Sequence, residues 1–290
     1  MNTIKMALGI LISALLLISC ANSSQNGNET TVVTIEGEKG NFTLKVNGED
    51  YFIKGAGGQD YLERLKEYGG NTIRTWSAGS AEEVLKDAGQ HGIMVAMGLW
   101  VQHESHGFDY NDEEAVKEQL EKFRGIVSNY AGHPSLLMWV VGNEVDLRYS
   151  NPKVWDAVDD IAAMIKEMDP DRPVMTVTAG AKEEVITEII NRAPNIDLLG
   201  INSYGGIGSV KEELDKAGWS KPYTVTEWGP NGHWEVAKTD WDVPIEQTST
   251  EKQELYKERY QQHIWGNKGH CVGSFVFLWG QKQERTPTWY

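Results

Sequence analysis

Cysteine and positive charge are both scarce in this sequence of 290 residues. The two cysteines, Cys20 and Cys271, are too few for a disulfide framework or a four-thiolate zinc site. The 27 Lys and Arg residues are outnumbered by 42 Asp and Glu residues, which gives a formal net charge of −15. Because the backbone of a nucleic acid is itself negative, this balance excludes a protein that binds phosphate backbones, and we expect no nucleic-acid partner.

Long apolar runs are also scarce, and the run at the amino terminus indicates a secretory signal. Residues 6–18 are apolar and follow Lys5, but they are too few to span a bilayer comfortably. The run ends in LISC, which resembles the lipobox of bacterial lipoproteins, whose cysteine is lipidated and becomes the first residue after cleavage. The resemblance implies a signal peptide over 1–19, lipidation of Cys20, a polar tether over 20–32 and an outer-membrane lipoprotein, on the periplasmic face or the cell surface, held to the membrane only by its lipid. The alternative is a plain signal peptide with an incidental cysteine.

Strand and helix patterns alternate along the rest of the chain, 33–290. Two alternating runs around Asn47-Gly48 indicate a β-hairpin that leads into a first strand near 51–55, and we expect this hairpin to cap the floor of a barrel. Helices are predicted over 60–68, 80–91, 112–131, 153–168, 181–192, 209–218 and 249–266. Further strands are predicted over 71–76, 92–100, 135–145, 174–180, 196–206, 223–229 and 272–280.

This alternation predicts an α/β fold, a closed (β/α)8 TIM barrel that forms one catalytic domain. Strands that are apolar on both faces belong in a parallel sheet covered by helices, and eight of them suffice to close a barrel. The alternative is a doubly wound open sheet, but GAGGQD after Lys54 has neither the G-x-G-x-x-G spacing nor the Walker lysine of its phosphate-binding turn. Only ten residues follow Gly280, so we expect the last helix to be missing from this chain.

Polar and aromatic side chains gather where the predicted strands end, which is the rim at which barrel enzymes hold their substrates. These residues are Arg74, Trp76, Trp100, Asn143, Glu144, Asn202, Tyr204, Glu227, Trp228 and Trp279. Glu144 and Glu227 each follow an apolar strand, where a carboxylate is costly unless it is paired or hydrogen-bonded. Two such carboxylates predict an acid and a nucleophile for the cleavage of an acetal, and we expect no cofactor. The alternative is that one of them is a buried partner of Arg74.

Other features are compatible with a carbohydrate site. Eleven Trp and eleven Tyr supply flat amphipathic rings of the kind on which sugars stack, although such rings also fill protein cores. Trp234 and Trp241 lie in the longest loop and are predicted to be sugar platforms. The segment QHESH, 102–106, could be taken for metal ligands, but its spacing is not H-E-x-x-H, and a loop that lines the substrate or forms hydrogen bonds is the simpler interpretation.

The strand-end residues resemble those of the clan of TIM-barrel glycoside hydrolases in which the acid and the nucleophile end strands four and seven. The most specific elements are the dipeptide Asn143-Glu144 and, three strands later, Glu227 in TEWG. The resemblance implies that Glu144 is the general acid/base, that Asn143 holds the sugar 2-hydroxyl and that Glu227 is the nucleophile. It also implies that Arg74 orients Glu227 and that Tyr204 donates a hydrogen bond to it.

The resemblance extends to a substrate class. It implies that Trp279 forms the floor of the cleavage subsite. The segments INSYGG and FTLKVNGEDYFIKG are similar to the barrel module of family 2 glycoside hydrolases and to β-1,3-glucanosyltransferases. The implied substrate is a β-1,3-glucan such as laminarin, with β-mannan, β-1,4-glucan and β-galactoside as rivals.

We therefore predict a retaining β-glycoside hydrolase that acts on a polysaccharide as a monomer. If the carboxyl groups lie about 5 Å apart, Glu227 attacks to form a covalent glycosyl-enzyme and Glu144 acts first as acid and then as base; a wider spacing means inversion. This chemistry requires surroundings that raise the pKa of Glu144, whereas Arg74 and Tyr204 favour the ionised form of Glu227. The alternatives are a glucanosyltransferase of the same fold, a non-catalytic glycan-binding lipoprotein and a metal-dependent hydrolase.

Overall fold

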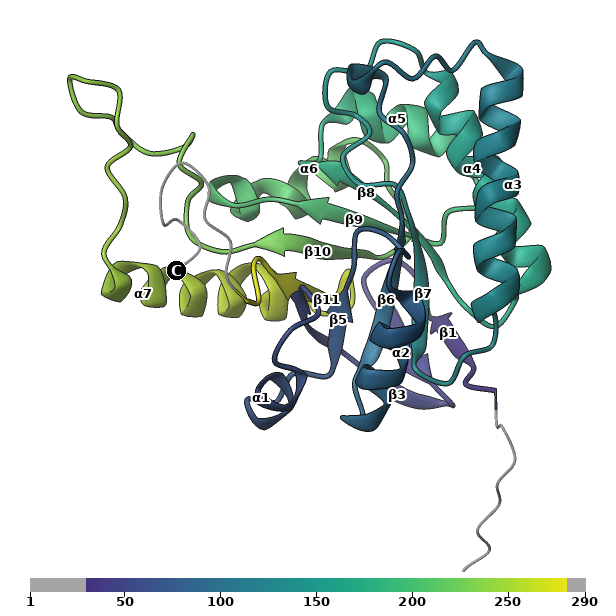
Figure 1. Cartoon of the computed structure of the whole chain (residues 1–290). Helices are drawn as coiled ribbons and strands as arrows, with labels where there is room; N and C mark the ends of the chain where they lie inside the picture. The colour runs from purple at the N-terminus through teal and green to yellow at the C-terminus, as the bar shows by residue number, and fades with distance from the viewer. Residues whose placement is uncertain (1–29, 281–290) are drawn as a thin grey trace, which may run out of the picture.

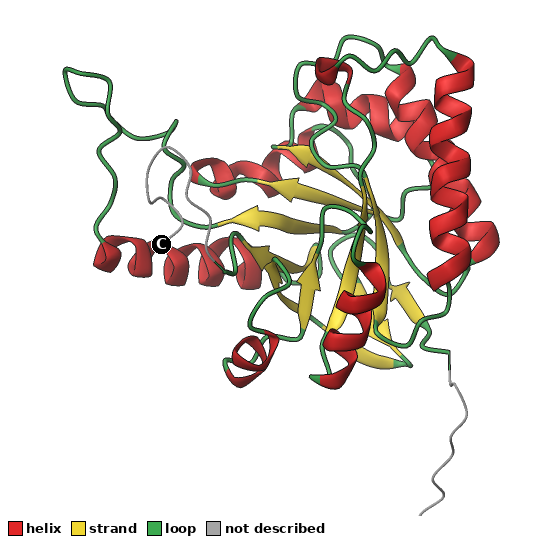
Figure 2. Cartoon of the chain, viewed as in Figure 1, coloured by secondary structure: helices red, strands yellow, loops and turns green. Residues whose placement is uncertain are grey.

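The computed structural model describes residues 30–280, in which a closed parallel barrel is surrounded by helices (Figures 1 and 2). The strands follow one another around the barrel in the order β10-β11-β4-β5-β6-β7-β8-β9, so the last strand closes on the first. The barrel strands are β4 Ile53–Gly57, β5 Thr72–Arg74, β6 Met94–Leu99, β7 Leu136–Val141, β8 Val174–Ala179, β9 Leu198–Asn202, β10 Tyr223–Trp228 and β11 Cys271–Val276. The predicted TIM barrel is therefore confirmed.

The helices lie outside the barrel, as the alternating pattern predicted. They are α1 Leu62–Glu67, α2 Ala81–Gln90, α3 Glu113–Tyr130, α4 Lys153–Met168, α5 Glu183–Arg192, α6 Val210–Lys216 and α7 Ser249–Arg259. Thr248 and Glu251 form a capping box that satisfies backbone N–H groups at the start of α7. The helix predicted over 249–266 is found, but its type changes after Arg259, where α7 ends. The chain continues as a π-helical turn and a 3-10 turn, η3 Tyr260–Ile264 and η4 Trp265–Asn267.

A small antiparallel sheet closes the amino-terminal end of the barrel. It consists of β1 Val33–Glu36, β2 Thr43–Val46 and β3 Glu49–Tyr51. The turn between β2 and β3 is Asn47-Gly48, whose φ angles of 52° and 82° lie in the left-handed region that these two residue types tolerate best. Val33 and Leu44 are buried in one cluster with Leu198, Phe275 and other residues of the barrel strands. The hairpin therefore caps the floor, as predicted, and it pairs with a further strand, β1, that was not predicted.

Backbone geometry at the opposite rim positions the site. Gly142 and Glu144 follow β7 with φ angles of 78° and 52°, and the Glu144 N–H donates to the Val177 carbonyl at 2.9 Å. A non-glycine residue in this region is strained by about 1 kcal/mol or more, so the surrounding contacts hold Glu144 in place. On β6, a Cβ atom at Gly98 would lie 2.4 Å from the Thr75 carbonyl oxygen. Gly98 therefore lets the chain that follows β5 pass close beside β6.

The terminal features predicted from the sequence lie outside the described residues. These are the signal peptide over 1–19, the lipidation site Cys20 and the absence of an eighth helix after Gly280, all of which stay predictions. The other cysteine, Cys271, is fully buried in β11. Within residues 30–280, no helix combines the length and the apolar character that crossing a bilayer requires.

Candidate active site

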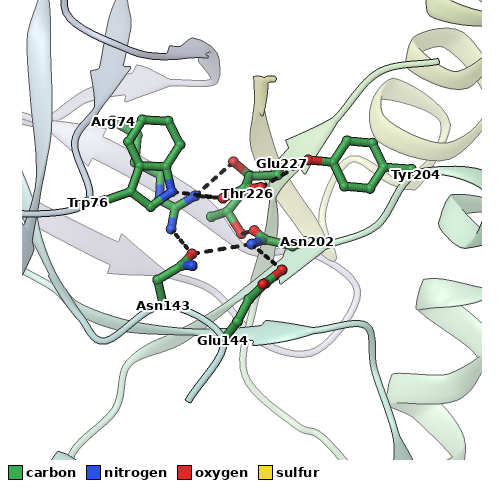
Figure 3. A network of polar contacts seen from close by, with 8 residues as sticks. All are labelled: Arg74, Trp76, Asn143, Glu144, Asn202, Tyr204, Thr226 and Glu227. Atoms are coloured by element: carbon green, nitrogen blue, oxygen red, sulfur yellow. Dashed lines mark hydrogen bonds and ion pairs between the residues drawn. The ribbon is translucent and has the colours of Figure 1, made fainter. Parts of the chain in front are cut away.

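A cavity of about 830 Å³ opens at the rim formed by the carboxyl ends of the barrel strands. Figure 3 shows the polar network that the strand ends bring together there. The cavity is lined by eight of the residues predicted from the sequence: Trp76, Trp100, Asn143, Glu144, Asn202, Tyr204, Glu227 and Trp234. It is also lined by residues that sequence reasoning did not select: Leu147, Ala179, Gly180, Ser203, Gly206, Glu235, Phe277 and Leu278.

Three donors converge on the carboxylate of Glu227 at the end of β10 (Figure 3). Arg74 Nη1 and Trp76 Nε1 donate to its Oε1 at 3.1 and 2.8 Å, and the Tyr204 hydroxyl donates to its Oε2 at 2.9 Å. The guanidinium of Arg74 is fully buried, so its charge is poorly screened and stabilises negative charge on the carboxylate. The bonds from Arg74 and Tyr204 were expected, whereas the bond from Trp76 was not.

The carboxyl group of Glu144 lies in a different environment, because among residues 30–280 its side chain accepts one hydrogen bond and forms no ion pair. Asn202 Nδ2 donates to its Oε1 at 2.9 Å. Burial and the nearby negative charge of Glu227 raise the pKa of Glu144 to about 7. A carboxyl group with this pKa is partly protonated near neutrality and can act as a general acid and then as a base.

The asparagine side chains join the two halves of the site. Arg74 Nη2 and Asn202 Nδ2 both donate to Asn143 Oδ1. The Thr226 hydroxyl donates to Asn202 Oδ1 at 2.8 Å, which turns the amide NH2 of Asn202 toward Glu144. Thr226 lies in β10 directly before Glu227, so neighbouring residues of one strand orient Asn202 and supply the second carboxylate. This role of Thr226 was not predicted from the sequence.

Aromatic rings form part of the cavity wall. Trp100 stacks on His103 with ring centroids 5.1 Å apart, and His103 stacks on His106 at 5.0 Å. Trp234 meets Tyr204 edge to face at 5.5 Å and is 55 % exposed, so its indole ring is available to a ligand. Trp100 and Trp234 line the cavity, so their rings suit stacking against a sugar face.

The structure places three predicted aromatic residues away from the cavity lining. Trp228 is 5 % exposed because it packs against the rings of Tyr256 and Tyr260, so it cannot contact a substrate and the prediction for it is corrected. Trp279 faces Tyr68, and Phe277 and Leu278 take the expected place of Trp279 in the wall. Trp241 is 74 % exposed in the outer part of the β10–α7 loop.

The QHESH segment, 102–106, is held in place by hydrogen bonds of Glu104. Both carboxylate oxygens of Glu104 accept hydrogen bonds from Ser150, and one also accepts from the backbone of Asn151, which ties this loop to the β7–α4 connection. Across residues 30–280, no group of three or more His, Cys, Asp or Glu side chains is arranged to hold a metal ion. These contacts fit the hydrogen-bonding interpretation of the segment.

The geometry brings two carboxyl groups of different character into one cavity. Glu227 is held by three donors, which suits a carboxylate that carries negative charge next to a developing positive centre. Glu144 has a raised pKa, which suits a group that gives and takes a proton. A site of this composition is able to cleave a glycosidic bond.

Comparison with known proteins gives a consistent result. Residues 59–278 match the model described as "Glycosyl hydrolases family 2, TIM barrel domain". A β-glucuronidase of Streptococcus agalactiae is 26% identical over 237 residues, which cover 68% of this chain and 37% of that protein. A β-galactosidase of Leuconostoc mesenteroides is 22% identical over 191 residues, which cover 61% of this chain and 18% of that protein.

Solved structures show the same fold. The β-D-glucuronidase of Dictyoglomus thermophilum superposes with a TM-score of 0.66 at 20% identity, covering 88% of this chain and 48% of that one. A β-galacturonidase of Eisenbergiella tayi gives a TM-score of 0.64 at 18% identity, covering 86% and 46%. The chain thus spans less than half the length of these relatives. The expected likeness to the family 2 barrel module is confirmed, and the likeness to β-1,3-glucanosyltransferases stays a prediction.

Proposed function

Because the chain belongs to the glycosyl hydrolases of family 2 through its TIM barrel domain, we propose that it hydrolyses a β-glycoside with retention of configuration. One observation carries the proposal. A single cavity holds Glu227 under three hydrogen-bond donors and Glu144 with a pKa raised to about 7. In this proposal Glu227 is the nucleophile and Glu144 is the acid/base.

The proposed reaction has two steps. In the first, Glu144 gives its proton to the glycosidic oxygen as the C1–O bond breaks, and an oxygen of Glu227 forms a bond to C1. In the second, Glu144 takes a proton from water, the water oxygen bonds to C1 and Glu227 is released as a carboxylate. Arg74, Trp76 and Tyr204 stabilise the charge that Glu227 carries before and after the covalent intermediate.

The proposed substrate class is a β-glycoside. Relatives named as β-glucuronidase, β-galactosidase and β-galacturonidase make β-uronides and β-galactosides the first candidates. The β-1,3-glucan expected from the sequence remains a further candidate, because the open cavity and the exposed ring of Trp234 suit an extended chain.

A substrate panel tests the proposal. Wild-type protein is incubated with aryl β-glucuronide, galacturonide, galactoside, glucoside and mannoside and with laminarin. Glu227→Gln should abolish turnover of every substrate, and Glu144→Gln should abolish turnover of laminarin but act more mildly on aryl glycosides with good leaving groups, whose departure needs little proton transfer. The control Glu118→Gln, on the exposed face of α3, should leave turnover unchanged. Products longer than the laminarin oligosaccharide supplied would indicate a glucanosyltransferase. Binding of a glycan without any turnover would favour the non-catalytic alternative.

A further inference from the structure

Glu235 is a third carboxylate in the cavity lining, and the proposed mechanism does not use it. It lies in the loop between β10 and α7, eight residues after Glu227. Both of its carboxylate oxygens lie 3.0 Å from the backbone nitrogen of Gly205, and Oε2 also accepts from the Gly232 N–H at 2.8 Å. These contacts connect the loop after β10 to the loop after β9.

The contacts close a tight turn around Trp234. The backbone N–H of Glu235 donates to the Gly232 carbonyl at 2.9 Å, and its side chain returns to the N–H of the same glycine. The indole of Trp234 lies directly over Gly232, where an added Cβ atom would stand 2.5 Å from the ring. The Glu235 carboxylate thereby restricts the turn that carries Trp234.

The other partner of Glu235 belongs to the segment that carries Tyr204. Gly205 directly follows Tyr204, whose hydroxyl donates to Glu227 at 2.9 Å and whose ring meets Trp234 edge to face. A Cβ atom at Gly205 would lie 3.0 Å from Glu235 Oε1, so the carboxylate sits closely against this backbone. One side chain therefore contacts both segments that shape this edge of the cavity.

We infer that Glu235 is a positioning residue that holds Trp234 against Tyr204 as a fixed wall for the sugar. The inference rests on the proposed glycosidase function for its effect on catalysis, but not for the clamp itself. Glu235 takes no proton in the reaction, so its removal should change substrate binding more than the pH dependence.

Hydrogen exchange tests the clamp without any substrate. In Glu235→Ala, the amides of Gly205 and Gly232 lose their acceptor and should exchange about tenfold faster or more. In Glu235→Gln, the remaining carbonyl oxygen still reaches these N–H groups, so exchange should stay within about threefold of wild type. The control Glu118→Ala, on the exposed face of α3, should leave the exchange rates of both amides unchanged. Unchanged exchange in Glu235→Ala overturns the inference, whether or not the protein is active.

Enzyme kinetics test whether Glu235 affects the wall that contacts the sugar. The substrate is the aryl β-glycoside that wild type hydrolyses fastest. Glu235→Ala should raise KM by about tenfold with a smaller change in kcat, and Glu235→Gln should restore most of the loss. Trp234→Ala should have a similar effect, and the double variant should be no worse than Trp234→Ala alone, because both changes remove one wall. Additive losses, or equal losses in Glu235→Ala and Glu235→Gln, overturn the inference. If wild type is inactive but Glu235→Ala speeds exchange, the proposed function fails and the clamp stands.

Discussion

At the scale of the residue, the two carboxyl groups owe their proposed roles to different neighbours. Burial and the charge of Glu227 disfavour ionisation of Glu144, whereas an arginine, an indole and a phenol all donate to Glu227. Neither residue type by itself determines which carboxyl group is the acid. The assignment therefore makes predictions about each one separately.

We expect the first step to fail on the alkaline side of neutrality. Glu144 must be protonated to act as the acid, and its pKa is about 7, so kcat/KM should fall as the pH rises through about 7. A pH–rate profile on an aryl glycoside with a poor leaving group measures this limb. A rate that stays constant up to pH 9 would contradict the role of Glu144 as acid.

The same pKa predicts a gain in stability on mutation. The folded protein binds the Glu144 proton more tightly than the unfolded chain does, so ionisation of Glu144 lowers the free energy of unfolding. This loss of stability is absent below about pH 4.5 and complete above about pH 7. Glu144→Gln should therefore raise the free energy of unfolding by up to about 3 kcal/mol at pH 8 and by little at pH 4.5. Urea denaturation at both pH values measures the difference. An equal effect at both would show that ionisation of Glu144 is not the cause.

Azide rescue assigns the nucleophile. In Glu227→Ala, azide can enter the space of the missing carboxylate and should give the glycosyl azide of inverted configuration. In Glu144→Ala, it should attack the glycosyl-enzyme and give the retained product. NMR of the anomeric proton distinguishes the two products. The opposite pattern would exchange the two roles.

At the scale of the element, the spacing of β5 and β6 sets the place of Trp76. Gly98→Ala should destabilise the protein by about 2 kcal/mol or more and lower activity, because its Cβ would lie 2.4 Å from the Thr75 carbonyl oxygen and displace the chain that leads to Trp76. Gly125 in α3 is the matched control, since nothing lies within 4 Å of an added Cβ. Gly125→Ala should be neutral or stabilise by up to about 1 kcal/mol. Urea titration of both variants checks the pair, and equal costs would refute the steric explanation.

The sequence predicted most elements because each carries its own periodic pattern. The helix α4, Lys153–Met168, has the predicted bounds, and its eight buried residues fall on one face. The strand β1 was missed because its alternation of apolar and polar residues lasts only four residues, too few to stand out after a polar tether, and it is completed by pairing with β2. The helix over 249–266 was predicted in extent but not in type, because the change to a π-helical turn at Tyr260 has no local signal.

Site residues were predictable when the chemistry of the side chain was itself unusual. A carboxylate after an apolar strand is costly and therefore conspicuous, which identified Glu144 and Glu227. Trp228 misled because it adjoins Glu227 but points to the opposite face of its strand, toward Tyr256. Phe277 and Leu278 gave no signal, since an apolar residue in an apolar run has the same sequence appearance in a core and in a cavity wall.

At the scale of the whole molecule, the predicted location of the protein at a membrane depends on the sequence of its amino terminus. Cys20 lies outside the described residues, and its lipidation stays a prediction from LISC. Cells grown with labelled fatty acid should label the wild-type protein but not Cys20→Ala, and only the wild type should sediment with membranes. Equal labelling of both, or wild-type protein free in the periplasm, would contradict the prediction.

The sheet that closes the barrel floor also affects how reactants reach and leave the two carboxyl groups. Val33 and Leu44 fill the amino-terminal end of the barrel, whereas the cavity that holds Glu144 and Glu227 lies at the carboxyl ends of the strands, so reactants approach the two carboxyl groups from the carboxyl end. The departing alcohol and the incoming acceptor therefore use the same cavity one after the other. In the proposed reaction, the glycosyl group goes to the acceptor, water or a second sugar, that is bound and oriented for attack at C1 once the alcohol has left. The balance between hydrolysis and transfer then depends on which acceptor occupies the cavity as well as on the chemistry at C1.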